Sequence, residues 1–337
     1  MQLATRYTTL VSIFVLITLA SCEEKDAEPE TVPPSVTTAT ATNISLHSAD
    51  VEAVVNNEGS SAITTRGVCY SKEMLPTLDD FIIASGSGTG VFQVEIILLQ
   101  SNTTYYVRAY AINETDTAFG NEVSFTTLED TGGCVSTDDV VYDYDCNAYD
   151  VIQIGDQYWL QQNLKTTHYR NGVEIPTGLS DDKWTTTDKG AYAIYDDMNA
   201  NDDVYGKLYN WFAVANENGL CPAGWHIPTY TEVLNLELFL GGADAAGGKM
   251  KTVLLWIEPN EGADNSSGFS ALPGGQRFFS SGVYGSQGTN AIFWTSSTSA
   301  NGGGKLGFYY VLSHLNSRLE RPYLDKHGGY SCRCIKD

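Results

Sequence analysis

Short alternating runs of apolar and polar residues dominate residues 35–128. The clearest runs cover residues 49–55, 92–96, 105–111 and 123–125, and Gly and Asn residues stand between them. Because successive side chains of a strand point to opposite faces, a period of two predicts β-strands. No helical pattern interrupts the series, so we expect an antiparallel all-β sandwich.

The pattern changes after the glycine-containing linker at residues 129–133. Apolar residues spaced for one helix face predict a helix over residues 206–215. Thr229 and Glu232 have the spacing of a capping box, which predicts a second helix that ends before Gly241. Beyond Gly248 the chain is rich in Gly, Ser and aromatic residues. These features together predict an α+β domain over residues 134–337.

The N-terminal segment has the features of a bacterial lipoprotein signal. An apolar run at residues 10–20 is too short to span a bilayer, and residues 19–22 (LASC) resemble a lipobox. We therefore expect residues 1–21 to be a signal peptide and Cys22 to carry acyl chains such as palmitate. An ordinary signal peptide with a coincidental cysteine is the alternative.

Residues 22–34 form an acidic, proline-containing tether in this interpretation. Acidic residues directly after the acylated cysteine resemble the surface-export signal of lipoproteins from Bacteroidetes-type bacteria. This resemblance implies an outer-membrane lipoprotein that faces the outside of the cell. A simple spacer beneath the outer membrane is the alternative.

The charge balance narrows the class of partner. The 337 residues include 19 Lys and Arg against 41 Asp and Glu, which gives a formal charge of −22. Without a basic cluster the chain cannot neutralise phosphates, so nucleic acid is excluded as an expected partner. The acidic residues are spread over the tether, the sandwich and the C-terminal domain, a distribution that favours solubility over one metal centre.

Three stretches of the first segment resemble fibronectin type III modules. They are residues 66–71 (RGVCYS), 104–111 (TYYVRAYA) and 120–127 (GNEVSFTT). The resemblance implies a spacer or interaction domain over residues 35–128. Cys69 lies within a predicted strand and is expected to be a buried free thiol.

Six stretches of the second segment resemble the motifs of another family and occur in the same order as in that family. They are 151–164 (VIQIGDQYWLQQNL), 205–211 (YGKLYNW), 221–229 (CPAGWHIPT), 268–275 (GFSALPGG), 293–297 (FWTSS) and 334–337 (CIKD). They resemble the Fibrobacter succinogenes major paralogous domain. That family is similar in fold to C-type lectin-like and formylglycine-generating-enzyme-like domains. The resemblance implies an architecture but no established activity.

The same resemblance implies a disulfide between Cys221 and Cys334. Cys134, Cys146 and Cys332 are additional to the family pattern. Export permits disulfides, and both a Cys134–Cys146 bridge and a Cys146–Cys332 bridge remain open. In either arrangement one of the three thiols stays free or pairs outside the domain.

Enzymatic chemistry has little support in the sequence, so we expect a protein that is not an enzyme. Formylglycine-generating enzymes hold copper with paired cysteines, and Cys332 and Cys334 invite that comparison. A copper-dependent oxidase is therefore the weaker alternative. The histidines show no metal-type spacing, and neither a phosphate loop nor a nucleophile elbow is present.

Alternating oxygen-bearing residues provide a candidate Ca²⁺ site. Asp197, Asn199, Asn201 and Asp203 converge on a cation if their segment forms a curled loop. The glycine and distant bidentate glutamate of an EF-hand are absent. Asx-turns explain the same residues without a metal, so the general expectation is no cofactor.

Binding or adhesion is the function that these features favour. Lectin-like folds bind glycans or proteins in their long-loop region, and aromatic rings suit sugar faces. The aromatic candidates are Tyr284, Phe293, Trp294, Tyr309 and Tyr310, of which we expect Trp294 to belong to the core. The ligand would be an extracellular glycan or protein. A structural envelope scaffold is the alternative function.

Overall fold

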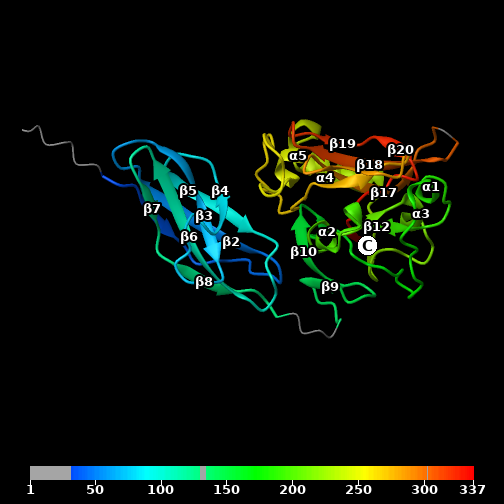
Figure 1. The fold of residues 1–337 in the computed structure, drawn as a ribbon, viewed down its shortest axis with the longest axis horizontal. Coiled ribbons are helices and arrows are strands. Elements are labelled where there is room, and N and C mark those ends of the chain that lie inside the picture. The colour runs from blue at the N-terminus through cyan, green and yellow to red at the C-terminus, as the bar shows by residue number, and fades with distance from the viewer. Residues whose placement is uncertain (1–31, 130–133, 302) are drawn as a thin grey trace, which may run out of the picture.

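The computed structural model describes residues 32–129, 134–301 and 303–337. The predicted signal peptide, Cys22 and most of the tether and linker lie outside these residues. The described chain forms an all-β body, blue to cyan-green in Figure 1, and a mixed body that runs from green to red. The two bodies lie side by side, and loops next to α5 of the second body face the first.

The first body is the predicted all-β sandwich. One sheet has three strands in the order β1-β2-β5, and the other has five, in the order β4-β3-β6-β7 with β8 paired to β6. The strands are β1 (Ser35–Thr38), β2 (Ala49–Asn57), β3 (Ile63–Ser71), β4 (Phe81–Ala84), β5 (Gly90–Ile96), β6 (Thr104–Asn113), β7 (Thr117–Phe119) and β8 (Val123–Thr126).

Alternation along β2 and β5 determines which side chains fill the sandwich core. Val51 and Val94 are paired across the two strands and are buried. Asp50 and Glu95, one position away on each strand, are paired in the same register and therefore point to the outer face. The predicted buried thiol is present, because Cys69 of β3 is free and fully buried.

The second body, here called the C-terminal domain, combines short helices with four small sheets. Its largest sheet has the order β14-β21-β11-β10-β9, and β21 near the C-terminus lies between β14 and β11. These strands are β9 (Val140–Tyr142), β10 (Ala148–Ile154), β11 (Gln157–Leu160), β14 (Trp225–His226) and β21 (Ile335–Lys336). The chain thus returns to the start of the domain.

The other sheets form the remaining half of the domain. A four-stranded sheet combines β17 (Asn290–Thr298), β18 (Leu306–Ser313), β19 (Leu319–Glu320) and β20 (Tyr323–Asp325). Two pairs complete the set: β12 (Tyr192–Ala193) with β13 (Leu208–Tyr209), and β15 (Gly274–Arg277) with β16 (Tyr284–Gln287). The helices are α1 (Asp181–Trp184), η1 (Tyr195–Asp197), α2 (Asn199–Tyr205), α3 (Trp211–Val214), α4 (Tyr230–Phe239) and α5 (Ala243–Met250).

The helix predicted from the capping box is confirmed as α4. The Thr229 side chain accepts a hydrogen bond from the backbone N–H of Glu232, and the Glu232 carboxylate accepts one from the backbone N–H of Thr229. Gly241 follows with a φ of 102°, a conformation that favours glycine after a helix. Local sequence therefore determines both ends of this helix.

The predicted helix over residues 206–215 is wrong in extent. Leu208 and Tyr209 form strand β13, and only Trp211–Val214 are helical. Asn210 separates the two elements because its side chain accepts a hydrogen bond from the backbone N–H of Ala213 and caps the shorter helix. Leu208 is buried, as its apolar spacing indicates, but it is buried in a strand that pairs with β12 and not on a helix face.

Helix α5 was not predicted, because two glycines lie in its interior. A Cβ atom on Gly247 would lie 2.2 Å from the carbonyl oxygen of Arg318, and one on Gly248 would lie 2.3 Å from that of Gly262. Glycine lowers helix propensity by about 1 kcal/mol relative to alanine. Tertiary packing therefore selects residues here that local propensity disfavours.

Candidate binding site between the two domains

A large cavity lies between the sandwich and the C-terminal domain. It encloses about 990 Å³ and has walls from both bodies. Its lining includes the carboxylates of Asp50, Glu95, Asp139, Asp150 and Asp264. None of the described residues that line it is Lys, Arg or His, and eleven of the other lining residues carry hydroxyl or amide groups. The cavity, here called the interdomain cleft, is therefore polar and acidic.

Glu95 joins the two walls of the interdomain cleft. Its carboxylate accepts hydrogen bonds from the Gln161 Nε2 atom at 2.7 Å, from the Ser270 hydroxyl at 3.1 Å and from the Asn265 side-chain amide. Burial is the main reason that the pKa of Glu95 rises to about 7, and the charge of Asp50 acts in the same direction.

Asp150 of β10 makes the second polar connection between the domains. Its carboxylate accepts a hydrogen bond from the backbone N–H of Leu46 at 3.3 Å and lies 3.2 Å from the Nδ1 atom of His47. Within its own domain Asp150 accepts a hydrogen bond from Gln162 at 2.7 Å. Leu254 adds an apolar contact, because it packs against the hydrophobic cluster of the sandwich.

The sequence did not single out these junction residues. Alternation in β5 places Glu95 on the outer face, which is the usual position of a solvated carboxylate. Its amide and hydroxyl partners lie 66 to 175 residues away along the chain, so only the folded structure brings them together.

The predicted Ca²⁺ site is not formed. Asp197 ends η1, whereas Asn199, Asn201 and Asp203 belong to α2, so the assumed curled loop is instead helical. Helical geometry turns side chains two positions apart to different directions. Asn201 hydrogen-bonds Gln287 and Asp197 accepts one from Tyr284. Among the described residues, no group of three or more His, Cys, Asp or Glu side chains has metal-binding geometry.

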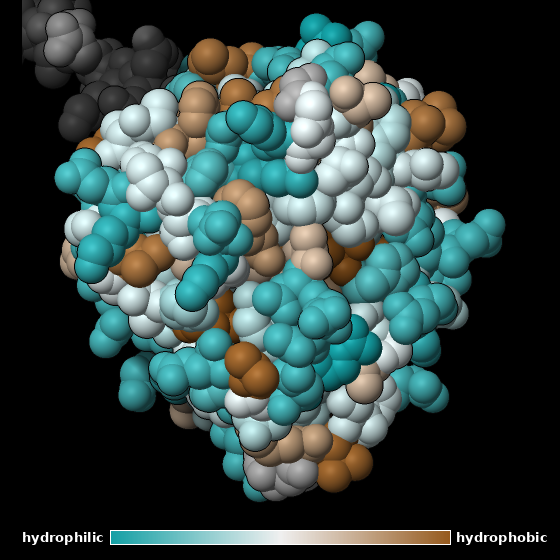
Figure 2. Space-filling model, turned by 90° about the vertical axis from the view of Figure 1, so that its right-hand side faces the viewer, coloured by the Kyte–Doolittle hydropathy of each residue, from teal (hydrophilic) through white to brown (hydrophobic). Residues whose placement is uncertain are grey.

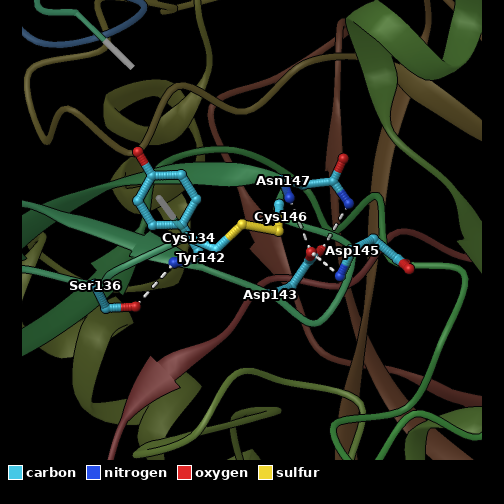
Figure 3. The surroundings of a disulfide bond; sticks show 7 residues. All are labelled: Cys134, Ser136, Tyr142, Asp143, Asp145, Cys146 and Asn147. Atoms are coloured by element: carbon cyan, nitrogen blue, oxygen red, sulfur yellow. Dashed lines mark hydrogen bonds between the residues drawn. A yellow bond between two sulfur atoms is a disulfide. The ribbon is translucent and has the colours of Figure 1, made fainter. Parts of the chain in front are cut away.

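Two disulfides are present in the described chain. Cys221 is bonded to Cys334, as the family resemblance implied, and Cys134 is bonded to Cys146. Figure 3 shows the second bridge beside the Asp143 turn, where the Asp143 carboxylate accepts hydrogen bonds from Asp145 and Asn147. This turn brings Cys146 within bonding distance of Cys134.

The proposed involvement of Cys332 in a disulfide is therefore wrong. Cys332 is a free thiol that is fully buried, and burial raises its pKa well above the usual value. Its neighbour Cys334 is already used in the bond to Cys221. The cysteine pair needed for the copper-dependent oxidase is consequently not available, since one sulfur is oxidised and the other is enclosed in the core.

Each of the five histidines has a structural partner in the described chain. The closest pairs join His168 to Asp145 and His327 to Asp325, both at 2.5 Å. His226 lies 2.7 Å from Asp337 and 3.1 Å from Glu232; burial opposes its protonation, but hydrogen bonds to these two carboxylates raise its pKa. His47 contacts Asp150, and His314 contacts the carbonyl oxygen of Glu258. His168 also contacts the Thr167 hydroxyl at 3.0 Å, but through the same Nδ1 atom that faces Asp145, so the ring cannot relay a proton between these two groups.

Most of the aromatic candidates for ligand binding are core residues. Phe293, Trp294 and Tyr310 are fully buried, which confirms the expectation for Trp294 and removes Phe293 and Tyr310 as ligand-binding candidates. The sequence had left the exposure of Tyr309 and Tyr310 open. Tyr309 is half-buried on the opposite face of β18 from Tyr310, as alternation predicts. Figure 2 shows separate small apolar patches, and no continuous apolar surface, on the face of the C-terminal domain that points away from the sandwich.

Among the described residues no helix is long and apolar enough to cross a membrane.

Comparisons with solved structures found matches to part of the chain. The sensor domain of the anti-sigma factor RsgI4 from Pseudobacteroides cellulosolvens aligns at 18% identity and a TM-score of 0.23, over 29% of this chain and 96% of that domain. A human fibronectin type III domain aligns at 15% identity and a TM-score of 0.26, over 35% of this chain and 99% of that domain. No curated protein matches the sequence.

The family comparison covers the C-terminal domain. A family model described as the Fibrobacter succinogenes major domain matches residues 152–336, which is more than half of the chain. The matched region contains β11, both disulfide partners Cys221 and Cys334, and the free thiol Cys332. The protein is therefore a member of the Fibrobacter succinogenes major domain family.

Proposed function

We propose that this protein is a lipid-anchored cell-surface protein that presents a non-catalytic binding module. The observation that carries the proposal is the interdomain cleft, an open polar cavity of about 990 Å³ with walls from both bodies. Ligand sites are concave, few per protein and frequent at domain interfaces.

The chemistry of the cleft restricts its ligand. Carboxylate, amide and hydroxyl groups hydrogen-bond well to sugar hydroxyls and to ammonium groups. Five carboxylates without a basic residue in the lining repel sulfated or uronic-acid ligands. The proposed ligand is therefore a neutral or amino glycan, or a basic segment of an extracellular protein, and the role is adhesion.

The lipid anchor and the likeness to C-type lectin-like domains are part of the same proposal. The lipobox-like sequence at residues 19–22 supports acylation of Cys22, and the acidic residues behind it support display on the outer membrane. The likeness of the family motifs to C-type lectin-like domains supports a binding role for residues 134–337. Mass spectrometry of the mature N-terminus tests the anchor, and an unmodified Cys22 would contradict it.

A cleft-blocking variant tests the binding role. Gln93 lines the cleft and has an exposed side chain, so Gln93→Arg places a long cationic side chain inside it. Thr89→Arg is the matched control, because Thr89 is exposed on the same body and does not line the cleft. The full chain in detergent is applied to an array of neutral, amino and acidic glycans and to immobilised basic envelope proteins.

We expect binding to fall at least about tenfold with Gln93→Arg and to remain with Thr89→Arg, since a blocked pocket excludes its ligand. Equal loss in both variants would contradict the cleft as the site. No binding by the wild-type chain, together with specific crosslinking to one envelope protein outside the cleft, would favour the envelope scaffold instead.

A further inference from the structure

A single carboxylate of the sandwich is enclosed by the C-terminal domain. Glu95 lies on the outer face of β5 and would meet water if the two bodies separated. In the docked structure it is instead held by three neutral donors: Gln161, Asn265 and Ser270. Docking therefore transfers an ionisable group from water to a partly buried site where none of its hydrogen-bond donors is charged. The hydrogen bonds from Gln161 and Ser270 favour ionised Glu95, but burial and the neighbouring carboxylates outweigh them.

The charges around Glu95 are almost all negative. Asp50 is directly opposite on β2, and the charge of Asp150 on β10 also acts on Glu95. Two groups near the junction can carry a positive charge. His47 contacts Asp150, and Arg333 donates a hydrogen bond to the carbonyl oxygen of Phe269, the residue before Ser270. The remaining acidic groups at the same cleft are Asp139 and Asp264.

Neither cation neutralises Glu95 directly. His47 is paired with Asp150, and Arg333 donates its hydrogen bonds to the side chain of Asn163 and the carbonyl oxygen of Phe269. An ionised Glu95 therefore faces like charges on two elements without a compensating ion pair. Like charges placed directly opposite on neighbouring strands are destabilising, and the partial burial of Glu95 strengthens this effect.

We propose that the junction is a proton-dependent latch, in which protonation of Glu95 favours the docked arrangement of the two bodies and its ionisation favours their separation. One consequence of the latch rests on the proposed function: separation of the bodies would open the ligand cleft, because its two walls meet only in the docked arrangement. The docking equilibrium itself requires no ligand.

The direction of the pH effect follows from the two environments of Glu95. Burial raises its pKa to about 7 in the docked form, whereas an exposed glutamate titrates near 4.5. The docked form therefore binds more protons between these values, so docking is strongest below pH 4.5 and weakens as the pH rises to about 7. The equilibrium constant for docking falls on the order of 100-fold across this window.

Distance measurement between two spin labels tests the latch in the full chain in detergent. Thr89→Cys and Glu217→Cys place the labels on exposed positions of the two bodies, and the free thiols Cys69 and Cys332 are buried. Glu95→Gln keeps the shape without the charge. Glu52→Gln is the matched control, because Glu52 is exposed on the same face of β2.

We expect one narrow distance at pH 5 and a second, broad population at pH 8 in the wild-type background and in Glu52→Gln. Glu95→Gln should stay narrow at both pH values. A wild-type distribution that is identical at pH 5 and pH 8 would overturn the latch, and so would a Glu95→Gln chain that is broad at either pH. Because no ligand is added, a failed glycan or protein screen leaves this result unaffected.

Discussion

Cys221 and Cys334 are bonded to each other across 113 residues, and the bond joins the turn before β14 to the start of β21. These two strands are neighbours in the five-stranded sheet, with His226 paired to Ile335. The disulfide therefore reinforces the return of the chain end to the sheet in which the domain begins. Its sulfurs are buried with the large aromatic cluster of this domain.

Removal of this disulfide should be the most destabilising of the cysteine changes. A bond that closes a loop of this length contributes about 5 kcal/mol by loop-closure entropy, whereas the Cys134–Cys146 loop contributes about 3 kcal/mol. We expect Cys221→Ala/Cys334→Ala to lower the free energy of unfolding more than Cys134→Ala/Cys146→Ala does. Urea unfolding of both variants measures the difference, and the reverse order would contradict it.

Gly247→Ala should destabilise the protein although alanine favours helices. The new Cβ atom would lie 2.2 Å from the backbone oxygen of Arg318, and a backbone atom cannot move away cheaply. We expect a loss of about 2 kcal/mol or more, as for other overpacked sites. Asp244→Ala on the exposed side of the same helix is the control and should change stability by less than about 0.5 kcal/mol. Thermal unfolding measures both, and a stabilised Gly247→Ala chain would refute the packing explanation.

Lys251→Met should remove a charged donor that three partly buried carbonyl oxygens share. The Lys251 ammonium, which is fully buried, donates to the backbone oxygens of Glu261 and Ser313 at 2.9 Å and of Asn316 at 3.0 Å. The Glu261 oxygen keeps a hydrogen bond from the Ser317 hydroxyl at 3.3 Å. Each unsatisfied group costs about 1–3 kcal/mol, so we expect a loss of about 2 kcal/mol or more from the other two oxygens. Lys249→Met on α5 is the control, and urea midpoints near pH 7 compare the two.

The same lysine predicts a pH dependence. Burial lowers the pKa of Lys251 to about 8, below its usual 10.5, so the unfolded chain binds more protons between these values. The contribution of Lys251 to the free energy of unfolding therefore rises as the pH increases from about 8 to 10.5. The difference in the free energy of unfolding between the wild type and Lys251→Met should show this slope. A difference that is constant from pH 7 to 10.5 would disprove the assignment.

His226 predicts a slope of the opposite sign. Its hydrogen bonds to Asp337 and Glu232 outweigh the effect of burial and raise its pKa above 6.5. Its contribution is fully present below pH 6.5 and is lost as the pH rises through the raised value. His226→Gln should remove this part of the pH dependence in thermal unfolding, and a slope that His226→Gln leaves unchanged would contradict the assignment.

Addition of millimolar Ca²⁺ or EDTA should leave the melting temperature unchanged. Asp197, Asn199, Asn201 and Asp203 do not converge, because η1 and α2 turn their side chains in different directions. A ligand that binds only the folded state would raise the melting temperature. A Ca²⁺-dependent shift that Asp197→Asn abolishes would show that the four residues do rearrange around a cation.

Patterns within a few neighbouring residues predicted some of the strands and one helix correctly. Alternation in β2 and β5 identified the sandwich, and Thr229 with Glu232 identified the start of α4. The family motifs identified the Cys221–Cys334 bond. The pattern failed at residues 206–215, where a strand and a cap replaced most of a helix, and at α5, where close backbone contacts require glycine.

The sequence by itself determined the two bodies, and the resemblance of its motifs to a known family implied one long-range disulfide. Only the tertiary structure decided that Cys332 is enclosed, that the oxygen-rich segment is helical, and that Glu95 meets Gln161, Asn265 and Ser270. The physical reason is one of range. Periodicity and capping act over a few residues, whereas burial and the pKa of Glu95 depend on groups up to 175 positions apart in the chain.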